Sequence, residues 1–291
     1  MADPLSRAAG DEEAFRAIVG RLEEWSGCPF SHYRAGTLRR RMERRMAITG
    51  QPDLAHYLCY ITENPQELER LLDSVTLKVS EFFRDHGLFQ WLATHWLPPL
   101  VEARSHLRGG PEIRVWSAAC AHGEEPYSLA ILVVDYLDRK GLGTENCTIL
   151  GTDIDPSAVE RAREGIYPKE QLAKVMERYG AYFLSHPRLG PDRLQVVPRV
   201  RNLVDFACFD LSSPRYTAPP AAVFAEYDLV FVRNVMIYYD DQIKGEMMAK
   251  LHRALRRGGL LVLGRSERLP GSWEPFFQEV ERRFKVYRRV G

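Results

Sequence analysis

Apolar positions recur three or four residues apart across residues 12–110, which is the spacing of a buried helix face. The stripes comprise Ala14, Ile18, Leu22 and Trp25, then Leu38, Met42 and Met46, then Leu68, Leu71, Leu72 and Val75. Pro52 and Pro65 lie between stripes, where one helix can end and the next begin. Because no stretch of this region alternates like a strand, the pattern predicts an all-helical N-terminal domain over residues 1–110.

Beyond residue 112 short apolar runs alternate with helical stretches. The runs predict strands at 113–118, 148–153, 227–232 and 260–265, with helices from about Pro126, from about Pro156 and over 240–257. Such alternation is typical of an α/β domain with a mostly parallel sheet and crossover helices. We expect the last helix to end at Arg256–Gly259, where two cations precede two glycines. Residues 284–290 alternate and are expected to form a final antiparallel strand.

Residues 166–210 interrupt this alternation. They contain β-rich pieces within 194–211 and a turn-like stretch at 186–192. The pattern fits either a small inserted subdomain or an extended excursion before the sheet resumes. We expect a small β-subdomain at about 180–207, inserted into an α/β domain over residues 111–291.

Composition narrows the function classes without naming one. The formal net charge of +1 means that a polyanionic partner would need a local basic patch. No apolar run approaches the roughly 18 residues of a membrane span, and acids lie where a signal peptide needs its apolar core. The five cysteines are widely spaced and form no CxxC motif, and the histidines lack the spacing typical of metal ligands. We therefore expect a cytoplasmic protein with no metal site and no membrane insertion.

The segment VWSAACAHGEEPYSLAILVV, residues 115–134, begins like a buried strand and ends like a helix. A dinucleotide-binding turn would carry GxGxxG, whereas here small residues replace most of the glycines. Glu124 and Glu125 lie where the helix begins, a position that favours an anion. Because protein carboxylates take the place of a ligand phosphate, the turn favours a ligand with hydroxyls and a cation but no phosphate.

Asp153 ends the second predicted strand, where a carboxylate can accept hydrogen bonds from both ribose hydroxyls of an adenosine. S-adenosylmethionine has a ribose and a sulfonium cation but no phosphate, so it fits the turn and Asp153 together. The alternative is that these acids only cap helices. Their position at the ends of the first two predicted strands favours the ligand.

The chain resembles the CheR family, the chemotaxis methyltransferases that methylate glutamates on chemoreceptors. The resemblance covers nearly the whole chain and rests on SEFFRD (80–85), RVWSAACAHGEEPYSLA (114–130), TDIDPSAVERAREGIY (152–167), YDLVFVRNVMIYYD (227–240) and LVLGRSERL (261–269). It implies a helical N-terminal domain followed by a Rossmann-like, S-adenosylmethionine-dependent methyltransferase domain with a small β-subdomain. It also implies glutamate methyl esters and S-adenosylhomocysteine as products.

The resemblance also implies roles for single residues. An Asn usually stands where this chain has Lys78, and an Asn-Leu pair where it has Asp210-Leu211. Arg84 and Tyr238 are implied to orient the substrate carboxylate; the structural alternatives are an interdomain salt bridge and a core tyrosine. The implied cofactor-binding residues are Lys78, Ser80, Arg84, Ala118, Glu124, Asp153, Asp210, Leu211, Arg233 and Asn234.

The strongest run of positive charge is RAGTLRRRMERRM, residues 34–46. Its arginines could form a solvated helix face, or they could dock on the Glu-rich helices of a chemoreceptor, as the resemblance implies. The absence of interleaved aromatics and of global basicity argues against nucleic acid. The predicted docking residues are Arg39, Arg40, Arg41, Arg44 and Arg45. The protein is expected to be a monomer.

Three functions compete at this stage. The leading one is a protein-glutamate O-methyltransferase acting on chemoreceptors. The second is a module that binds S-adenosylmethionine and a signalling partner without turnover, which Lys78 keeps open. The third is a methyltransferase for a small molecule or RNA, since the fold alone does not fix the substrate.

Overall fold

The computed structural model describes residues 4–30, 33–76, 80–106, 108–185, 188, 190–219 and 226–291, with side chains from residue 10 onward. The chain divides into two compact units. The first comprises residues 1–78 together with Tyr238–Ile243, and the second comprises Val79–Ile237 and Lys244–Gly291. Each unit is described by itself.

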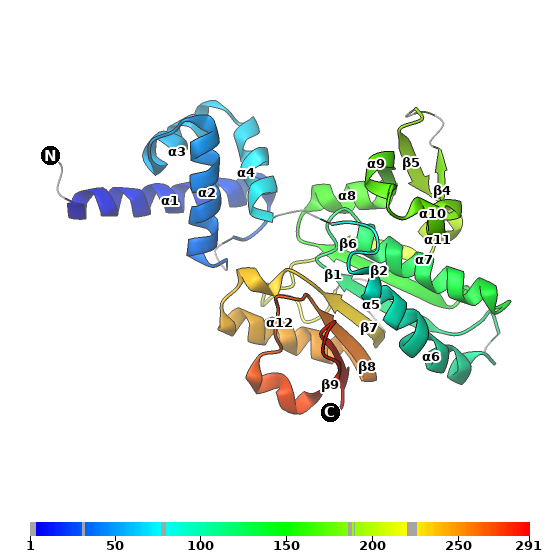
Figure 1. The fold of residues 1–291 in the computed structure, drawn as a ribbon. Coiled ribbons are helices and arrows are strands. Elements are labelled where there is room, and N and C mark those ends of the chain that lie inside the picture. Colours follow the sequence, from blue (N-terminus) through cyan, green and yellow to red (C-terminus); the bar gives the residue numbers. More distant parts are fainter. Residues whose placement is uncertain are drawn as a thin grey trace. The chain divides into compact units, whose positions relative to one another are not determined.

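The first unit is helical, as predicted. It contains α1 (Pro4–Ser26), α2 (Ala35–Thr49), α3 (Leu54–Glu63) and α4 (Gln66–Thr76) (Figure 1). The predicted stripes form its core, because Ile18, Leu22, Met42 and Leu71 are fully buried. Two stripe residues depart from this: Trp25, near the end of α1, is 46% exposed, and Met46 is only partly buried.

The second unit is built on a mixed sheet. In the described residues the strand order is β6-β2-β1-β7-β8-β10-β9. The strands are β1 (Ile113–Ala118), β2 (Cys147–Asp153), β6 (Val204–Cys208), β7 (Tyr227–Val232), β8 (Leu255–Leu263), β9 (Phe277–Glu281) and β10 (Val286–Arg289). β6, β2, β1, β7 and β8 are parallel, and β10 is antiparallel to both β8 and β9. Because β2 and β7 flank β1, the strand order reverses at β1, which is where ligands bind in such sheets.

Helices cover this sheet and join its strands (Figure 1). They include α5 (His86–Trp91), a π-helical turn (Leu92–Trp96), α6 (Leu97–Arg104), α7 (Glu124–Arg139), α8 (Pro156–Glu164) and α12 (Asp241–Ala254). The short 3-10 helices are Met236–Tyr238 and Gly271–Phe276. α5 and α6 were expected in the N-terminal domain, but Leu88, Leu92 and Val101 lie in one apolar core with β1 and α7. The boundary therefore lies near residue 78 and not at 110.

The interruption between β2 and β7 contains a small antiparallel sheet. Among the described residues its order is β3-β5-β4, from Ile166–Pro168, Arg193–Val196 and Phe183–Ser185. Short helices accompany it: α9 (Lys169–Leu172), α10 (Met176–Tyr179), a 3-10 turn (Gly180–Tyr182) and α11 (Pro198–Arg201). The β-subdomain thus begins before the expected residue 180, and Val204–Cys208 belongs to the main sheet.

The expected helix end at Arg256–Gly259 is wrong. α12 ends at Ala254, and these residues lie within β8, where the pairing with β7 shifts register after Leu255. Gly258 has a left-handed φ of 79°, and a Cβ on Gly259 would lie 3.0 Å from the carbonyl oxygen of Tyr227. The glycines serve an irregular strand in close contact with its neighbour, and not a helix cap.

None of the helices in the described part of the chain has the length and apolar character needed to cross a bilayer.

Candidate functional site

The carboxyl ends of β6, β2, β1 and β7 lie along one edge of the sheet, because these strands are parallel. Buried Ala118 ends β1, and the turn to α7 follows at once. Ala119, Ala121 and Gly123 in this turn have left-handed φ angles of 62°, 49° and 92°. At Gly123 a side chain has no room, since a Cβ would lie 2.9 Å from that of Ala162. The turn is therefore tight and closely packed against α8.

Asp153 ends β2 and lies against this turn. One carboxylate oxygen accepts the Ala121 N–H at 2.8 Å, and the other accepts the Asp155 N–H at 3.1 Å. Asp155 in turn caps α8 by accepting the Ser157 N–H at 2.8 Å. The carboxylate of Asp153 is thereby fixed at the end of β2, beside the carboxyl end of β1.

Glu124 begins α7 and is only 4% exposed. Its Oε2 is buried and has no hydrogen-bond partner among the residues that the structure describes. Burial raises the pKa of Glu124 to about 7, against the opposing effect of its backbone N–H and of Ser80. Glu124 is thus a carboxyl group with an unused acceptor at a helix N-terminus.

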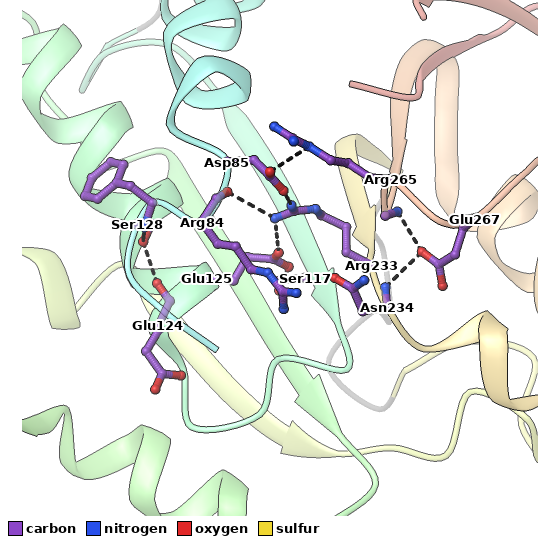
Figure 2. Close-up of polar contacts among 12 residues, drawn as sticks. Arg84, Asp85, Ser117, Glu124, Glu125, Ser128, Arg233, Asn234, Arg265 and Glu267 are labelled. Carbon is purple, nitrogen blue, oxygen red and sulfur yellow. Dashed lines mark hydrogen bonds and ion pairs between the residues drawn. The ribbon is translucent and has the colours of Figure 1, made fainter. Parts of the chain in front are cut away.

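Glu125, one residue later, is fully paired. Figure 2 shows its carboxylate between Ser117 and Arg233. Ser117 Oγ donates to Oε1 at 2.7 Å, and Arg233 Nη1 donates to Oε2 at 3.0 Å. Two adjacent acids therefore have different tasks: Glu125 holds the site together, and Glu124 keeps an unpartnered oxygen.

The Arg233 side chain is 4% exposed and lies at the centre of a charged network (Figure 2). Besides Glu125, its guanidinium contacts the Arg84 carbonyl at 3.4 Å and forms an ion pair with Asp85. The other oxygen of Asp85 binds Arg265 Nε at 2.7 Å. Both terminal nitrogens of Arg233 are engaged by the protein, while its buried Nε has no hydrogen-bond partner among the described residues, and its predicted contact with the cofactor stays a prediction.

The segment carrying Ser80 and Arg84 is fastened to the start of α7. The Phe83 N–H donates to Ser128 Oγ at 2.8 Å, and this hydroxyl donates to the Glu124 carbonyl at 2.6 Å. Phe83 and Asp85 both have left-handed φ angles, so the chain turns sharply on either side of Arg84. In Figure 2 the Arg84 side chain extends between Glu124 and Asn234.

Asp210 and Leu211 follow β6 at the same edge. One Asp210 oxygen accepts the N–H and hydroxyl of Ser212, at 2.8 and 2.6 Å, while Oδ2 is buried without a hydrogen-bond partner among the described residues. Sequence reasoning missed Lys250 of α12, whose buried ammonium donates to the carbonyls of Leu211, at 2.7 Å, and Ser213. Burial lowers the pKa of Lys250. Only its spacing on an amphipathic helix could have drawn attention to it.

Asn234 follows Arg233 after β7 and has a left-handed φ of 61°. Its N–H donates to the buried carboxylate of Glu267 at 2.8 Å. Glu267 was quoted in the motif LVLGRSERL but given no role.

Tyr238 groups with the helical unit. Its ring stacks on Tyr33 with 5.8 Å between centroids and 18° between planes, and its carbonyl accepts the Arg34 N–H at 2.8 Å. Its catalytic role stays a prediction. Lys78 lies outside the described residues.

The five arginines of α2 have different surroundings. Arg40 and Arg44 are exposed, and Arg41 is partly buried. Arg39 binds Glu12 and lies over the Phe15 ring at 4.3 Å.

Arg45 is 14% exposed and binds Glu67 through two hydrogen bonds of 2.7 and 2.8 Å. Glu67 is buried, and the Tyr57 hydroxyl also donates to it at 2.9 Å. Burial, with the nearby Glu67 carboxylate, raises the pKa of Tyr57 well above its usual range. Arg45 is thus an internal partner of the helical unit, whereas Arg40 and Arg44 point to solvent. The docking role of the five arginines stays a prediction.

Comparison with protein families identifies both units. A model described as "CheR methyltransferase, SAM binding domain" matches residues 78–285, and one described as "CheR methyltransferase, all-alpha domain" matches residues 13–76. The chain belongs to the CheR methyltransferase family. The two matches meet at the boundary between the compact units, and the sheet edge described above belongs to the S-adenosylmethionine-binding domain of the family.

Curated relatives span most of the chain. A chemotaxis protein methyltransferase of Escherichia coli (strain K12) is 32% identical over 283 residues, which cover 96% of this chain and 90% of the relative. Chemotaxis protein methyltransferase 1 of Pseudomonas aeruginosa is 31% identical and covers 91% and 92% of the two chains. An uncharacterized 104.1 kDa protein of Rhodobacter capsulatus is 35% identical over 88% of this chain, which spans only 26% of that longer protein.

The residues at the sheet edge fit S-adenosylmethionine. Glu124 Oε2 and Asp210 Oδ2 are buried acceptors without a hydrogen-bond partner among the described residues. Since a buried acceptor without a donor is costly, both positions favour a ligand that brings hydroxyls, an ammonium group or another cationic centre. These two acceptors therefore support the family's cofactor, which carries hydroxyls and cationic groups.

Proposed function

We propose that this protein transfers methyl groups from S-adenosylmethionine to glutamate side-chain carboxylates of a chemoreceptor's cytoplasmic helical bundle, in chemotaxis-type adaptation. The observation that carries the proposal is the row of acidic side chains at the sheet edge, Glu124, Asp153 and Asp210, in a chain of the CheR family. The names of its relatives supply the chemotaxis context.

The proposed cofactor contacts divide into two groups. Side chains that can reach the ligand directly are Ser80, Arg84, Glu124, Asp153, Asp210 and Asn234, with Ala118 and Leu211 contributing backbone. Arg233 acts by holding Arg84 and Glu125. When bound, S-adenosylmethionine supplies an electrophilic methyl group on a positively charged sulfur, and the products are a glutamate methyl ester and S-adenosylhomocysteine.

The chain's own residues would contribute orientation. A glutamate carboxylate is already ionised near neutral pH, so the reaction needs no general base. Catalysis then rests on holding the carboxylate oxygen close to the methyl carbon and in line with it. We assign this task to Arg84 and Tyr238, both of which donate hydrogen bonds to carboxylates. The hydrogen bonds to the substrate carboxylate must be of moderate strength, because a very strong ion pair with Arg84 would make the carboxylate a weaker nucleophile.

Receptor docking is assigned to the exposed part of α2. Arg40 and Arg44 are available for acidic helices, whereas Arg45 is committed to Glu67. An Arg40→Ala, Arg44→Ala double variant should therefore raise the KM for receptor and leave the KM for S-adenosylmethionine unchanged. A matched Arg253→Ala variant, on α12, serves as the charge control.

The deciding experiment incubates the protein with methyl-labelled S-adenosylmethionine and a chemoreceptor cytoplasmic fragment. We expect label on the receptor that mild base releases, and no label when the receptor's candidate glutamates are alanine or when Asp153→Ala is used. Base-stable label would indicate another acceptor atom and refute ester formation. Cofactor binding by calorimetry without label on any of a panel of receptors would favour the non-catalytic binding module. Label on RNA or a small molecule instead would favour the third function.

A further inference from the structure

Glu267, in the loop after β8, is a buried carboxylate whose described partners are backbone N–H groups. It is 3% exposed. Oε2 accepts the N–H of Asn234 at 2.8 Å and of Gly264 at 2.6 Å. Oε1 accepts the N–H of Val235 at 2.9 Å and of Met236 at 2.8 Å. Burial raises the pKa of Glu267, although these N–H groups oppose that effect.

This arrangement joins the chain leaving β7 to the chain leaving β8. The two strands are parallel neighbours that pair up to Val232 and Leu263, so both chains emerge at the sheet edge that carries the site. Asn234 has the left-handed φ of 61°, a conformation that Asn tolerates better than most other non-glycine residues. The bonds from Asn234, Val235 and Met236 to one rigidly held carboxylate maintain this turn.

Gly264 leaves room for the Asn234 side chain. A Cβ at Gly264 would lie 2.8 Å from the Asn234 backbone nitrogen and 3.1 Å from its Nδ2. The same Cβ would lie 2.6 Å from Glu267 Oε2. The side-chain amide of Asn234 is therefore seated against the backbone of residue 264, and its position depends on both Gly264 and Glu267. Figure 2 shows Asn234 and Glu267 joined at this point.

The converging N–H groups would otherwise attract an anion. Backbone N–H groups that point at one spot form a common binding site for phosphate or carboxylate. Here Glu267 fills that position from within the chain. The turn after β7 therefore faces a ligand with the Asn234 amide and not with free backbone donors, which agrees with a cofactor that has no phosphate.

We propose that Glu267 is a positioning residue for cofactor binding, which fixes the turn at Asn234 and thereby presents the Asn234 amide to S-adenosylmethionine. The proposal rests on the proposed function, since it takes this edge as the cofactor site. It adds a residue that touches neither cofactor nor substrate and acts through Asn234.

A double-mutant cycle tests it, with S-adenosylhomocysteine affinity measured by calorimetry. Glu267→Gln keeps the shape of the side chain but replaces one acceptor oxygen with an NH₂ that opposes the backbone donors. We expect about tenfold weaker binding, the factor that about 1.4 kcal/mol represents. In an Asn234→Ala background, Glu267→Gln should change the affinity by less than about twofold, because the group it positions is gone. Glu274→Gln, an exposed acid on the 3-10 helix Gly271–Phe276, should bind like the wild type.

The outcomes separate the two proposals. Wild-type protein that fails to bind S-adenosylhomocysteine contradicts the proposed function. Wild-type binding with an equal loss for Glu267→Gln in both backgrounds, or with no loss, overturns the positioning role. If Glu267→Gln does not fold, hydrogen exchange of the cofactor-free wild type decides: the amides of Val235 and Met236 must be protected, and fast exchange there overturns the role.

Discussion

Replacing Glu124 by Gln should stabilise the protein at alkaline pH while weakening its cofactor binding. The pKa of Glu124 is raised by burial from 4.5 to about 7. A carboxyl group whose pKa is higher in the folded state than in the unfolded state loses stability as pH rises. The loss begins near pH 4.5 and is complete above pH 7. The difference of about 2.5 units corresponds to about 3 kcal/mol of unfolding free energy.

Gln has the shape of Glu but carries no charge, so it resembles the protonated form at every pH. We therefore expect Glu124→Gln to unfold with a free energy about 3 kcal/mol higher than wild type at pH 8.5, and with nearly the same free energy at pH 4.5. The assay is urea unfolding followed by circular dichroism, with the two slopes compared to confirm that the same surface is exposed. Affinity for S-adenosylmethionine should fall in the same variant, because we propose that the unpartnered Oε2 of Glu124 accepts a hydrogen bond from the ligand.

Glu125→Gln is the matched control, since it changes the adjacent acid of the same helix turn. Glu125 is paired with Arg233 and Ser117, so removing its charge leaves Arg233 short of a partner and should destabilise the protein by about 1–3 kcal/mol. Equal effects of the two substitutions would refute the reasoning, as would a Glu124→Gln variant that is no more stable than wild type at pH 8.5.

Three further predictions concern the residues around the site and in the helical unit. Asp153→Ala should weaken S-adenosylmethionine binding at least tenfold by calorimetry, because it removes the ribose acceptor and frees the Ala121 turn. Arg45→Met should lower the unfolding free energy by about 3 kcal/mol, since it leaves the buried Glu67 carboxylate with only the Tyr57 hydroxyl and an exposed Arg70 guanidinium 3.9 Å away, while exposed Arg44→Met should change the melting temperature little. Lys250→Met should weaken S-adenosylhomocysteine binding through the loop at residues 211–213, and unchanged affinity would show that the ammonium has only a structural role.

β1 and β7 could be predicted from the sequence because both are buried in the middle of the parallel sheet. β1 and β7 match the predicted ranges 113–118 and 227–232, since a parallel strand covered on both faces is mostly apolar. The domain boundary was not predictable from helical periodicity, which is the same for a helix in a bundle and for α5 and α6 on a sheet. The glycines at 258–259 were misassigned because a helix cap and an irregular strand both require left-handed φ or close backbone contact.

At the site, the residues that reach toward a ligand were easier to find than those that hold them. Asp153 ends β2 and Glu124 begins the helix that follows β1, so local order in the sequence marks them. Lys250 and Glu267 act on backbone atoms of segments distant in sequence, and no local pattern marks such contacts. The ion pairs of Arg233 with Glu125 and Asp85 are equally non-local, so the sequence does not mark them.

In each of two pairs of sequence neighbours, Glu124–Glu125 and Arg233–Asn234, one residue forms an internal ion pair and, in the described part of the chain, the other does not. Glu125 and Arg233 form an ion pair inside the protein, while their sequence neighbours Glu124 and Asn234 lie outside that ion pair. If Glu124 were also paired with a cation of the protein, its carboxylate would have no reason to attract a cationic ligand. The internal ion pair thus leaves the Glu124 carboxylate available for the positively charged cofactor that we propose binds beside it. Burial of the ionised Glu124 carboxylate lowers the unfolding free energy as the pH rises toward 7. We expect the same buried charge to increase the affinity for the cofactor.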